Sequence, residues 1–378
     1  MFKKFDNYDG VCFFNGLVFF SPVALLIRTQ AGVSKSMFFI LQALLSIAIF
    51  LGEIPTGYIT DRIGYKRSII LSQTLMFIAR VLLLLAFLNS SLWLFVFEAL
   101  VEGVANCFSS GTNSAYLYSV FGAENFTGKS AHSANYGTAG FIISTISYAA
   151  IYKYHGIMGL LIATVIAGFV AEIFSLFLVK ETKIQRAEAT SISKIIGLMK
   201  NKKAGLYMAM LSLFSVSWIL INFFFVEKLE NAGISVEWMA GIILGYSAFQ
   251  MLAEPLISRF SKQPARKMLL VTGVTGGLAM AVFGVMSRAW LVLPAMLILP
   301  LLIILPEYYL MEQENRLVDT LGMDDNRAAS LSVLNMGVNL VEIITLFSSA
   351  LISGGGITWC FLVIGILLVM CSLCNLRK

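Results

Sequence analysis

Residues 57–67 read GYITDRIGYKR and connect two long apolar runs, 36–58 and 68–88. Each run is long enough to cross the hydrocarbon core of a bilayer, which is about 30 Å thick and takes about 20 helical residues. The charges of the stretch lie between the runs, and Gly64 allows a sharp turn. The stretch therefore predicts a short loop between two membrane-spanning helices.

The apolar character of these two runs extends through the chain. Of its 378 residues, 58% are hydrophobic and only 13% are charged, and the mean hydropathy is +0.84. A soluble domain is typically about 45–50% apolar and about 25% charged. It must also present polar groups to water. The composition therefore excludes a soluble enzyme, a nucleic-acid binder and a disordered protein, and it predicts a protein surrounded by the lipid bilayer.

Apolar runs bounded by charge, Gly or Asn predict an all-α polytopic membrane protein with 12 transmembrane helices. The expected spans are 9–29, 36–58, 68–88, 92–118, 131–152, 157–179, 205–226, 236–257, 268–287, 289–310, 328–352 and 356–375. One long polar segment, 180–204, divides the chain near its middle. We therefore expect a six-helix bundle over 1–179, a cytoplasmic linker over 180–204 and a second six-helix bundle over 205–378.

The distribution of basic residues predicts the orientation, because Lys and Arg favour cytoplasmic loops. With both termini in the cytoplasm, 21 of the 27 Lys and Arg residues lie on the cytoplasmic side. The five expected outside are Arg28, Lys35, Lys153, Lys228 and Arg288. We therefore expect a multi-pass protein of the plasma (inner) membrane with both termini cytoplasmic. The net charge of +6 belongs to these loops and does not indicate a nucleic-acid partner.

An internal repeat appears at an offset of about 200 residues. Glu53, at the end of one span, matches Glu254, and Asn135 matches Asn335. Matching loops lie on the same side of the membrane, so the repeat is parallel. A parallel repeat of two bundles is typical of carriers whose central site alternates between the two membrane faces.

The loop 57–67 resembles the G-x-x-x-D-R-x-G-R-K loop of the major facilitator superfamily, with Tyr65 where an Arg is common. The resemblance implies the major facilitator fold and a loop that latches the cytoplasmic ends of the bundles in the outward-facing state. An acidic residue here suits a helix N-terminus, where the macrodipole favours an anion. The expected cytoplasmic gate consists of Gly57, Asp61, Arg62, Gly64, Lys66, Arg67 and, near the end of span 289–310, Glu307.

Three further segments, 53–57, 110–115 and 327–332, resemble a subgroup of drug or metabolite exporters, which implies multidrug efflux by an antiporter. Two departures limit this resemblance. Span 92–118 has Glu98 to Gly103 where the antiporter pattern carries an Arg followed by Gln-Gly, and span 131–152 lacks the Pro of the antiporter motif.

Ionisable residues at membrane depth usually face a cavity or a charged partner. Glu98 and Glu102 share one helix face. At 1.5 Å per residue, Arg80 lies about 12 Å deep, between Glu98 at about 9 Å and Glu102 at about 15 Å. Two interpretations remain open: a charge cluster in the translocation path with one Glu exchanging a proton, or a structural ion pair.

The remaining candidates for the proton and substrate cavity lie in two other spans. Glu342 and Asn339 form one polar stripe of span 328–352 with Asn335, which suits cavity lining or a helix–helix hydrogen bond. Glu172, in span 157–179, is equally compatible with a cavity and with a structural contact.

The sequence contains neither a G-x-x-x-x-G-K-[ST] phosphate loop nor a zinc or nucleophile motif, and its five Cys residues fit packing positions. We therefore expect no cofactor, no metal and no enzyme activity. The prediction is a monomeric secondary transporter that moves a small amphipathic molecule by alternating access, with proton-coupled export favoured. Proton-coupled uptake of a nutrient, a lipid flippase and a receptor without transport are the alternatives.

Overall fold

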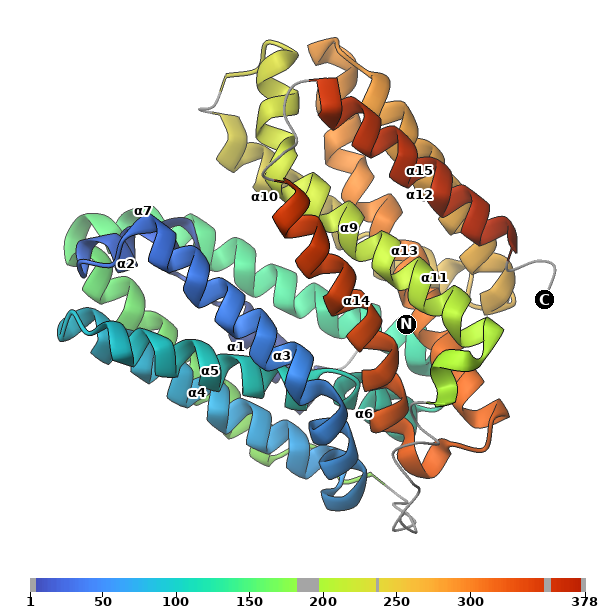
Figure 1. Ribbon diagram of the computed structural model, residues 1–378, viewed down its shortest axis with the longest axis horizontal. Helices are drawn as coiled ribbons and strands as arrows, with labels where there is room; N and C mark the ends of the chain where they lie inside the picture. The colour runs from blue at the N-terminus through green and yellow to red at the C-terminus, as the bar shows by residue number, and fades with distance from the viewer. Residues whose placement is uncertain (1–4, 182–196, 236–237, 350–354, 375–378) are drawn as a thin grey trace.

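The computed structural model describes residues 5–181, 197–235, 238–349 and 355–374, and its regular elements within these ranges are all helices (Figure 1). The α-helices are α1 (Asn7–Gly16), α2 (Ala24–Gln30), α3 (Lys35–Ile63), α4 (Tyr65–Leu88), α5 (Leu92–Ser109), α6 (Thr112–Phe121), α7 (Ala123–Leu176), α9 (Lys202–Asn231), α10 (Met239–Gln250), α11 (Ala253–Arg259), α12 (Ala265–Val285), α13 (Ala289–Thr320), α14 (Arg327–Ser349) and α15 (Gly355–Cys374). The predicted all-α membrane fold is confirmed. Most of the expected linker, 182–196, lies outside the described residues.

Nine helical segments of the described residues are long and apolar enough to cross a membrane. One of them, α7, contains the expected span 131–152 and, as far as Leu176, the expected span 157–179; the two are separated at Gly156. There the backbone φ of +59° interrupts the helix, in the region that glycine adopts most readily. The total of twelve spans stays a prediction.

Several predicted spans are built from more than one helix or end elsewhere. Span 9–29 is divided between α1 and α2, and span 236–257 between α10 and α11. The predicted span 289–310 ends before the helix does, because α13 continues to Thr320. The polar residues that follow position 310 in the sequence are therefore helical, and several of them are buried between helices.

Side-chain caps fix where three of the helices begin. The Asp6 carboxylate accepts the N–H groups of Tyr8 and Asp9 at 2.9 and 3.0 Å, which caps α1. The Ser34 hydroxyl accepts the N–H of Met37 at 3.1 Å and caps α3. The Asn201 side chain caps α9 in the same way. Such caps satisfy N–H groups that have no partner within the helix.

The distribution of polar and apolar side chains is the reverse of that in a soluble protein. Leu51 and Ile146 on the outside are 67% and 64% exposed, whereas the side chains of Asp9 and Lys129 are completely buried. Charged groups inside and apolar groups outside are what a hydrocarbon environment favours. The chain is therefore a multi-pass membrane protein, as its sequence predicts.

Four exposed tryptophans lie at or near the N-terminal ends of four helices, α5, α10, α13 and α15. They are Trp93, Trp238, Trp290 and Trp359. Tryptophan is enriched where a membrane meets water. The predicted topology puts all four of these helix ends on the outer side of the membrane.

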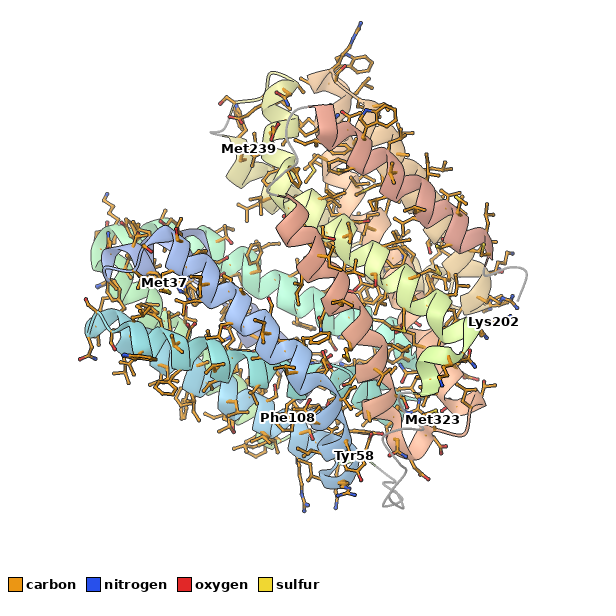
Figure 2. The ribbon with its side chains drawn as sticks, viewed as in Figure 1. Met37, Tyr58, Phe108, Lys202, Met239 and Met323 are labelled. Atoms are coloured by element: carbon orange, nitrogen blue, oxygen red, sulfur yellow. The ribbon has the colours of Figure 1, made fainter. Side chains whose placement is uncertain are left out.

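The helices from α1 to α7 gather in the lower left of Figure 1 and those from α9 to α15 in the upper right. The two groups meet where α14 packs against α3 and where α7 packs against α10, α11 and α13. In Figure 2, Tyr58 and Met323 lie toward the lower edge, where the groups converge, whereas Met37 and Met239 lie on two separate arms. The arrangement is V-shaped.

Candidate functional site

Two of the cavities among the described residues are lined by predicted site residues. The first has a volume of about 300 Å³. The residues that line it all belong to the first group of helices, and they include Asn15, Arg80 and Asn113. The second, of about 390 Å³, is lined by residues of both groups. Asn106, Ser109 and Asn113 line both cavities. These volumes fall in the range of small-molecule pockets, about 300–1,000 Å³.

The shared residues flank a break between α5 and α6, so the predicted span 92–118 consists of two helices. Gly111 lies at the break with a φ of +48°. A Cβ on this residue would lie 2.9 Å from the carbonyl oxygen of Ala328 in α14. Beside it, the Asn335 side chain donates to the Ser110 hydroxyl at 2.9 Å. Glycine therefore permits both the turn and the close approach of α14.

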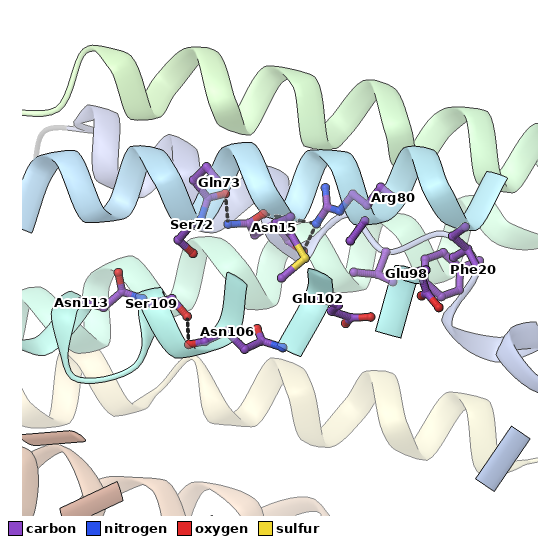
Figure 3. Close-up of a pocket in the computed structure, with 14 residues that line it drawn as sticks. Asn15, Phe20, Ser72, Gln73, Arg80, Glu98, Glu102, Asn106, Ser109 and Asn113 are labelled. Atoms are coloured by element: carbon purple, nitrogen blue, oxygen red, sulfur yellow. Dashed lines mark hydrogen bonds between the residues drawn. The ribbon is translucent and has the colours of Figure 1, made fainter. Parts of the chain in front are cut away.

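Arg80 projects from α4 into the first cavity (Figure 3). Its guanidinium donates to the Asn15 side-chain oxygen at 3.2 Å, and the Asn15 amide donates to Gln73 at 2.8 Å. A Cβ on Gly168 of α7 would lie 2.8 Å from the Arg80 Cδ, so this glycine makes room for the arginine. Within the described residues, Arg80 forms no ion pair.

Glu98 is paired with Arg28 and not with Arg80. The Arg28 guanidinium donates to both carboxylate oxygens of Glu98 at 3.1 and 3.2 Å, and both side chains are buried. Arg28, which the topology predicts on the outer side of the membrane, is buried because α2 folds it back against α5. Arg28 is the residue of this site that the sequence analysis missed.

Glu102 lies one helical turn after Glu98 and lines the first cavity together with Arg80 (Figure 3). Its side chain is half-buried. In the part of the chain that the structure describes, Glu102 takes part in no ion pair. The cavity therefore combines one carboxylate neutralised by Arg28 with a second carboxylate that is not ion-paired.

Glu172 lies outside both cavities. Its carboxylate accepts a hydrogen bond from the Thr74 hydroxyl at 2.9 Å, which connects α7 to α4. The Ser175 hydroxyl donates to the same carboxylate at 3.3 Å. The structure thus gives Glu172 a contact between neighbouring helices.

The other predicted residues divide between the second cavity and the part of the chain without described side chains. Asn339 lines the second cavity and donates to Glu53 at 3.2 Å. Glu307 also lines it and accepts a hydrogen bond from the Trp218 indole at 3.3 Å. Its expected place near a helix end is wrong, because α13 continues well beyond it. The side chain of Glu342 lies outside the described residues.

Two more carboxylates, Glu53 and Glu314, line the second cavity. Neither is among the predicted site residues. Glu53 belongs to the exporter-like segment 53–57, which is a usable signal. Glu314 lies beyond the predicted end of span 289–310, so the hydropathy pattern gives no signal for it.

The Asp61 carboxylate caps the N-terminus of α14. Its two oxygens accept the N–H groups of Ala328 and Ala329, each at 2.9 Å, and its side chain is buried. These groups are separated by more than 260 residues in the chain. An anion at a helix N-terminus is stabilised by unsatisfied N–H groups and by the helix dipole.

Two glycines shape the backbone around this contact. A Cβ on Gly57 would lie 2.7 Å from the Ala329 Cα, so glycine is required for the close contact of α3 with α14. Gly64 has a φ of +101° and joins α3 to α4 without an intervening loop.

Among the described residues, the basic side chains of the loop 57–67 form no ion pair with the second group of helices. Arg62 bonds the Tyr58 hydroxyl and lies over the ring of the same tyrosine, 4.2 Å from its centroid. The Lys66 backbone N–H donates to Glu181 at 3.3 Å. Arg67 is exposed. Asp61 therefore provides the charged contact of this loop with the second group of helices.

A second set of contacts continues from Asp61 across the same interface. Arg327, the first residue of α14, pairs with Asp319 and donates to the Asn315 backbone oxygen at 3.1 Å. The Tyr118 hydroxyl of α6 donates to Asp319 at 2.7 Å. Arg327 lies 4.5 Å from the centroid of the Tyr118 ring. These polar contacts join α6 to α13 and α14.

A third set of contacts joins α7 to α11. The Asn135 amide donates to the Glu254 carboxylate at 3.0 Å, and the His132 Nδ1 lies 2.7 Å from the other oxygen of this carboxylate. Glu254 and Asn135 are the residues that the sequence repeat matches with Glu53 and Asn335. The repeat thus places equivalent residue types at two interfaces between the groups.

The family model of the Major Facilitator Superfamily matches residues 10–306 of the chain. The comparison with curated proteins found no match to the chain. Among solved structures, the chain is similar to the E. coli fucose:proton symporter FucP, with 12% identity and a TM-score of 0.76 over 98% of this chain and 97% of that one.

Two other structures have the same overall fold. FucP in the outward conformation has a TM-score of 0.78 at 11% identity, with 97% of each chain covered. A bacterial homologue of the iron transporter ferroportin, in the outward-facing state, has a TM-score of 0.69 at 14% identity, with 98% of each chain covered. Because the family model covers most of the helical chain, the protein belongs to the major facilitator superfamily and is a membrane transporter, not an enzyme.

Proposed function

We propose that the protein is a secondary active transporter that moves a small amphipathic molecule by alternating access, with proton-coupled export as its activity. The second cavity carries this proposal, because residues of both helix groups line it. Next to it, Asp61 holds α3 on the N-terminus of α14. A site between two bundles with a contact that closes one end is what alternating access requires.

The moving units in this proposal are the bundles 1–179 and 205–378, connected by the linker 180–204. The contacts between them include polar ones: Asp61 with α14, Tyr118 with Asp319, and Asn135 with Glu254. Polar contacts exchange for water more readily than buried apolar contacts do. This supports an interface that opens and closes as a whole.

The closed end is assigned to the cytoplasm, with both termini on that side of the plasma (inner) membrane. The predicted excess of Lys and Arg supports this assignment. The gate of Gly57, Asp61 and α14 is then shut, and the protein faces outward, which is also the state of two of the similar structures.

Glu102 is the residue proposed to exchange the coupling proton. Arg28 neutralises Glu98, and Arg80 is held by Asn15, so Glu102 is the carboxylate of the first cavity that is not ion-paired in the described residues. The two cavities share three lining residues, Asn106, Ser109 and Asn113. A change of charge at Glu102 in the first cavity therefore acts on the wall of the second cavity, where the cargo is proposed to bind.

Export is favoured by the exporter-like segments 53–57, 110–115 and 327–332, which meet at the second cavity and the gate. Proton-coupled uptake is the second candidate function. The fold similarity to a fucose:proton symporter, at 12% identity, is the reason to test it.

Transport into vesicles of both orientations tests the proposal. A panel of labelled organic cations, peptides and lipids is offered to inside-out and right-side-out vesicles that contain the full-length protein, with protein-free vesicles as the control. Proton-coupled export predicts that at least one compound accumulates in inside-out vesicles with an acidic lumen, and that a protonophore abolishes the accumulation.

Three other results contradict proton-coupled export. Accumulation only in right-side-out vesicles with an acidic exterior shows uptake by symport. Movement of labelled lipids alone shows a flippase. No protein-dependent movement of any compound, in either orientation, rejects a transporter of these compound classes.

A further inference from the structure

Three carboxylates line the second cavity. Glu53 comes from α3, and Glu307 and Glu314 come from α13. The described residues that line this cavity include no Lys, Arg or His. Unlike the first cavity, where Arg80 faces two glutamates, the second one therefore has an excess of acidic groups.

Two of these carboxylates are buried and incompletely satisfied. Glu53 and Glu314 are only 2% and 4% exposed. The Oε2 atom of Glu53 and the Oε1 atom of Glu314 have no hydrogen-bond partner among the described residues. Burying a charge in this way is costly unless a charged partner compensates it. Among the described residues, Glu98 has such a partner in Arg28, whereas Glu53 and Glu314 form no ion pair.

We propose that the second cavity binds an organic cation, and that Glu53 and Glu314 provide the charges that hold it. The inference rests on the proposed function and specifies the cargo of that same site. One carboxylate comes from each helix group, so a bound cation lies between the two units that separate when the gate opens. Glu307, held by the Trp218 indole, adds to the negative charge of the cavity.

The size and the walls of the cavity favour an organic cation over a metal ion. The cavity has about 390 Å³, and Leu211, Met311 and Leu331 contribute apolar surface to it. Hard cations such as Mg²⁺ and Ca²⁺ are held by several oxygen ligands at about 2.0–2.6 Å. Within the described residues, no group of three His, Cys, Asp or Glu side chains is arranged to hold a metal.

Binding of radiolabelled benzyltrimethylammonium tests the inference, because this compound combines an aromatic ring with a permanent positive charge. The full-length protein is used in detergent without any gradient. Unlabelled benzyltrimethylammonium should displace the label, whereas benzyl alcohol, benzenesulfonate and Mn²⁺ should not. Glu53→Gln and Glu314→Gln should each weaken binding at least tenfold. Glu314→Asp, which keeps the charge, should retain binding within about threefold of the unmodified protein, whereas a tenfold loss corresponds to about 1.4 kcal/mol.

Glu172→Gln serves as the matched control, since it removes a carboxylate that lies outside both cavities. Melting temperatures confirm that each variant is folded. Affinities that are unchanged in folded Glu53→Gln and Glu314→Gln proteins overturn the inference. Displacement by benzyl alcohol, benzenesulfonate or Mn²⁺, or no binding to the unmodified protein, overturns it as well.

The test separates this inference from the proposed function. A protein that transports a neutral or anionic compound in vesicles but binds no organic cation remains a transporter with a different cargo. Conversely, a protein that binds the cation through Glu314 but moves no compound in vesicles of either orientation retains the site and loses the proposed transport.

Discussion

The guanidinium of Arg28 lies 3.1 Å from the carboxylate of Glu98, and neither side chain is more than 5% exposed. This buried pair connects α2 to α5 at one end of the first cavity. It removes Glu98 from the set of free carboxylates and leaves Glu102 and Arg80 facing the cavity without an ion pair among the described residues. In the first group of helices, Glu98 is therefore the carboxylate of a structural ion pair, and Glu102 is the one proposed to function in transport.

Replacing Arg28 by Met should destabilise the protein strongly, because it leaves Glu98 buried without its partner. Breaking such a pair from one side typically costs about 3–5 kcal/mol. The melting temperature of the detergent-solubilised protein should fall, and the double variant Arg28→Met with Glu98→Gln should recover much of the loss. Arg62→Met, at an exposed position, is the control. An equal loss in the single and double variants would show that Arg28 does not act through Glu98.

Asp61→Asn should weaken the contact with α14, because an amide offers one acceptor where the carboxylate offers two. The expected loss is about 0.3–2 kcal/mol, the range for charges at helix termini. The population should shift toward the state that is open to the cytoplasm. In a cysteine-free background, a cysteine at the fully buried position Ser332 should then react faster with a reagent added from the cytoplasmic side.

A cysteine at the exposed position Lys262 controls for reagent access. Equal labelling of position 332 with and without the Asp61→Asn substitution, together with intact transport, would leave the loop 57–67 without a gating role.

Gly57→Ala should disturb the same contact while leaving Asp61 in place. The added Cβ would lie 2.7 Å from the Ala329 Cα, so α3 and α14 must move apart. We expect faster cytoplasmic labelling of the cysteine at 332 and reduced transport. Gly205→Ala is the matched control, because nothing lies within 4 Å of its Cβ position. Alanine there favours the helix by up to about 1 kcal/mol. Equal behaviour of the two alanine variants would contradict the close-packing argument.

The sequence is sufficient to predict the membrane fold and the contact of Asp61 with a helix N-terminus. Hydropathy predicts which segments cross the bilayer, because hydrocarbon requires a long apolar surface. The D-R-x-G pattern predicts an acidic residue at a helix N-terminus, and Asp61 does cap α14. Both features depend on local composition, which a sequence displays directly.

The residues that the sequence does not reveal depend on how helices bend and end. Arg28 follows an apolar run, which favours an outer loop, and only the turn between α1 and α2 brings it to Glu98. Glu314 escapes prediction because α13 continues past the apolar part of its span, into residues that are buried against other helices. Neither a break in a span nor its extension changes the hydropathy pattern.

Transport by the Glu102→Gln variant tests the central claim, proton-coupled alternating access. One compound that the unmodified protein accumulates in inside-out vesicles is followed in two assays on the same vesicles, with Glu172→Gln as the control. One assay measures exchange of labelled for unlabelled compound without a gradient, and the other measures accumulation driven by an acidic lumen. The account predicts that Glu102→Gln retains exchange and loses the gradient-driven accumulation, whereas Glu172→Gln keeps both. Retention of both activities by Glu102→Gln would contradict Glu102 as the proton site, and loss of both would make it a structural or cargo-binding residue.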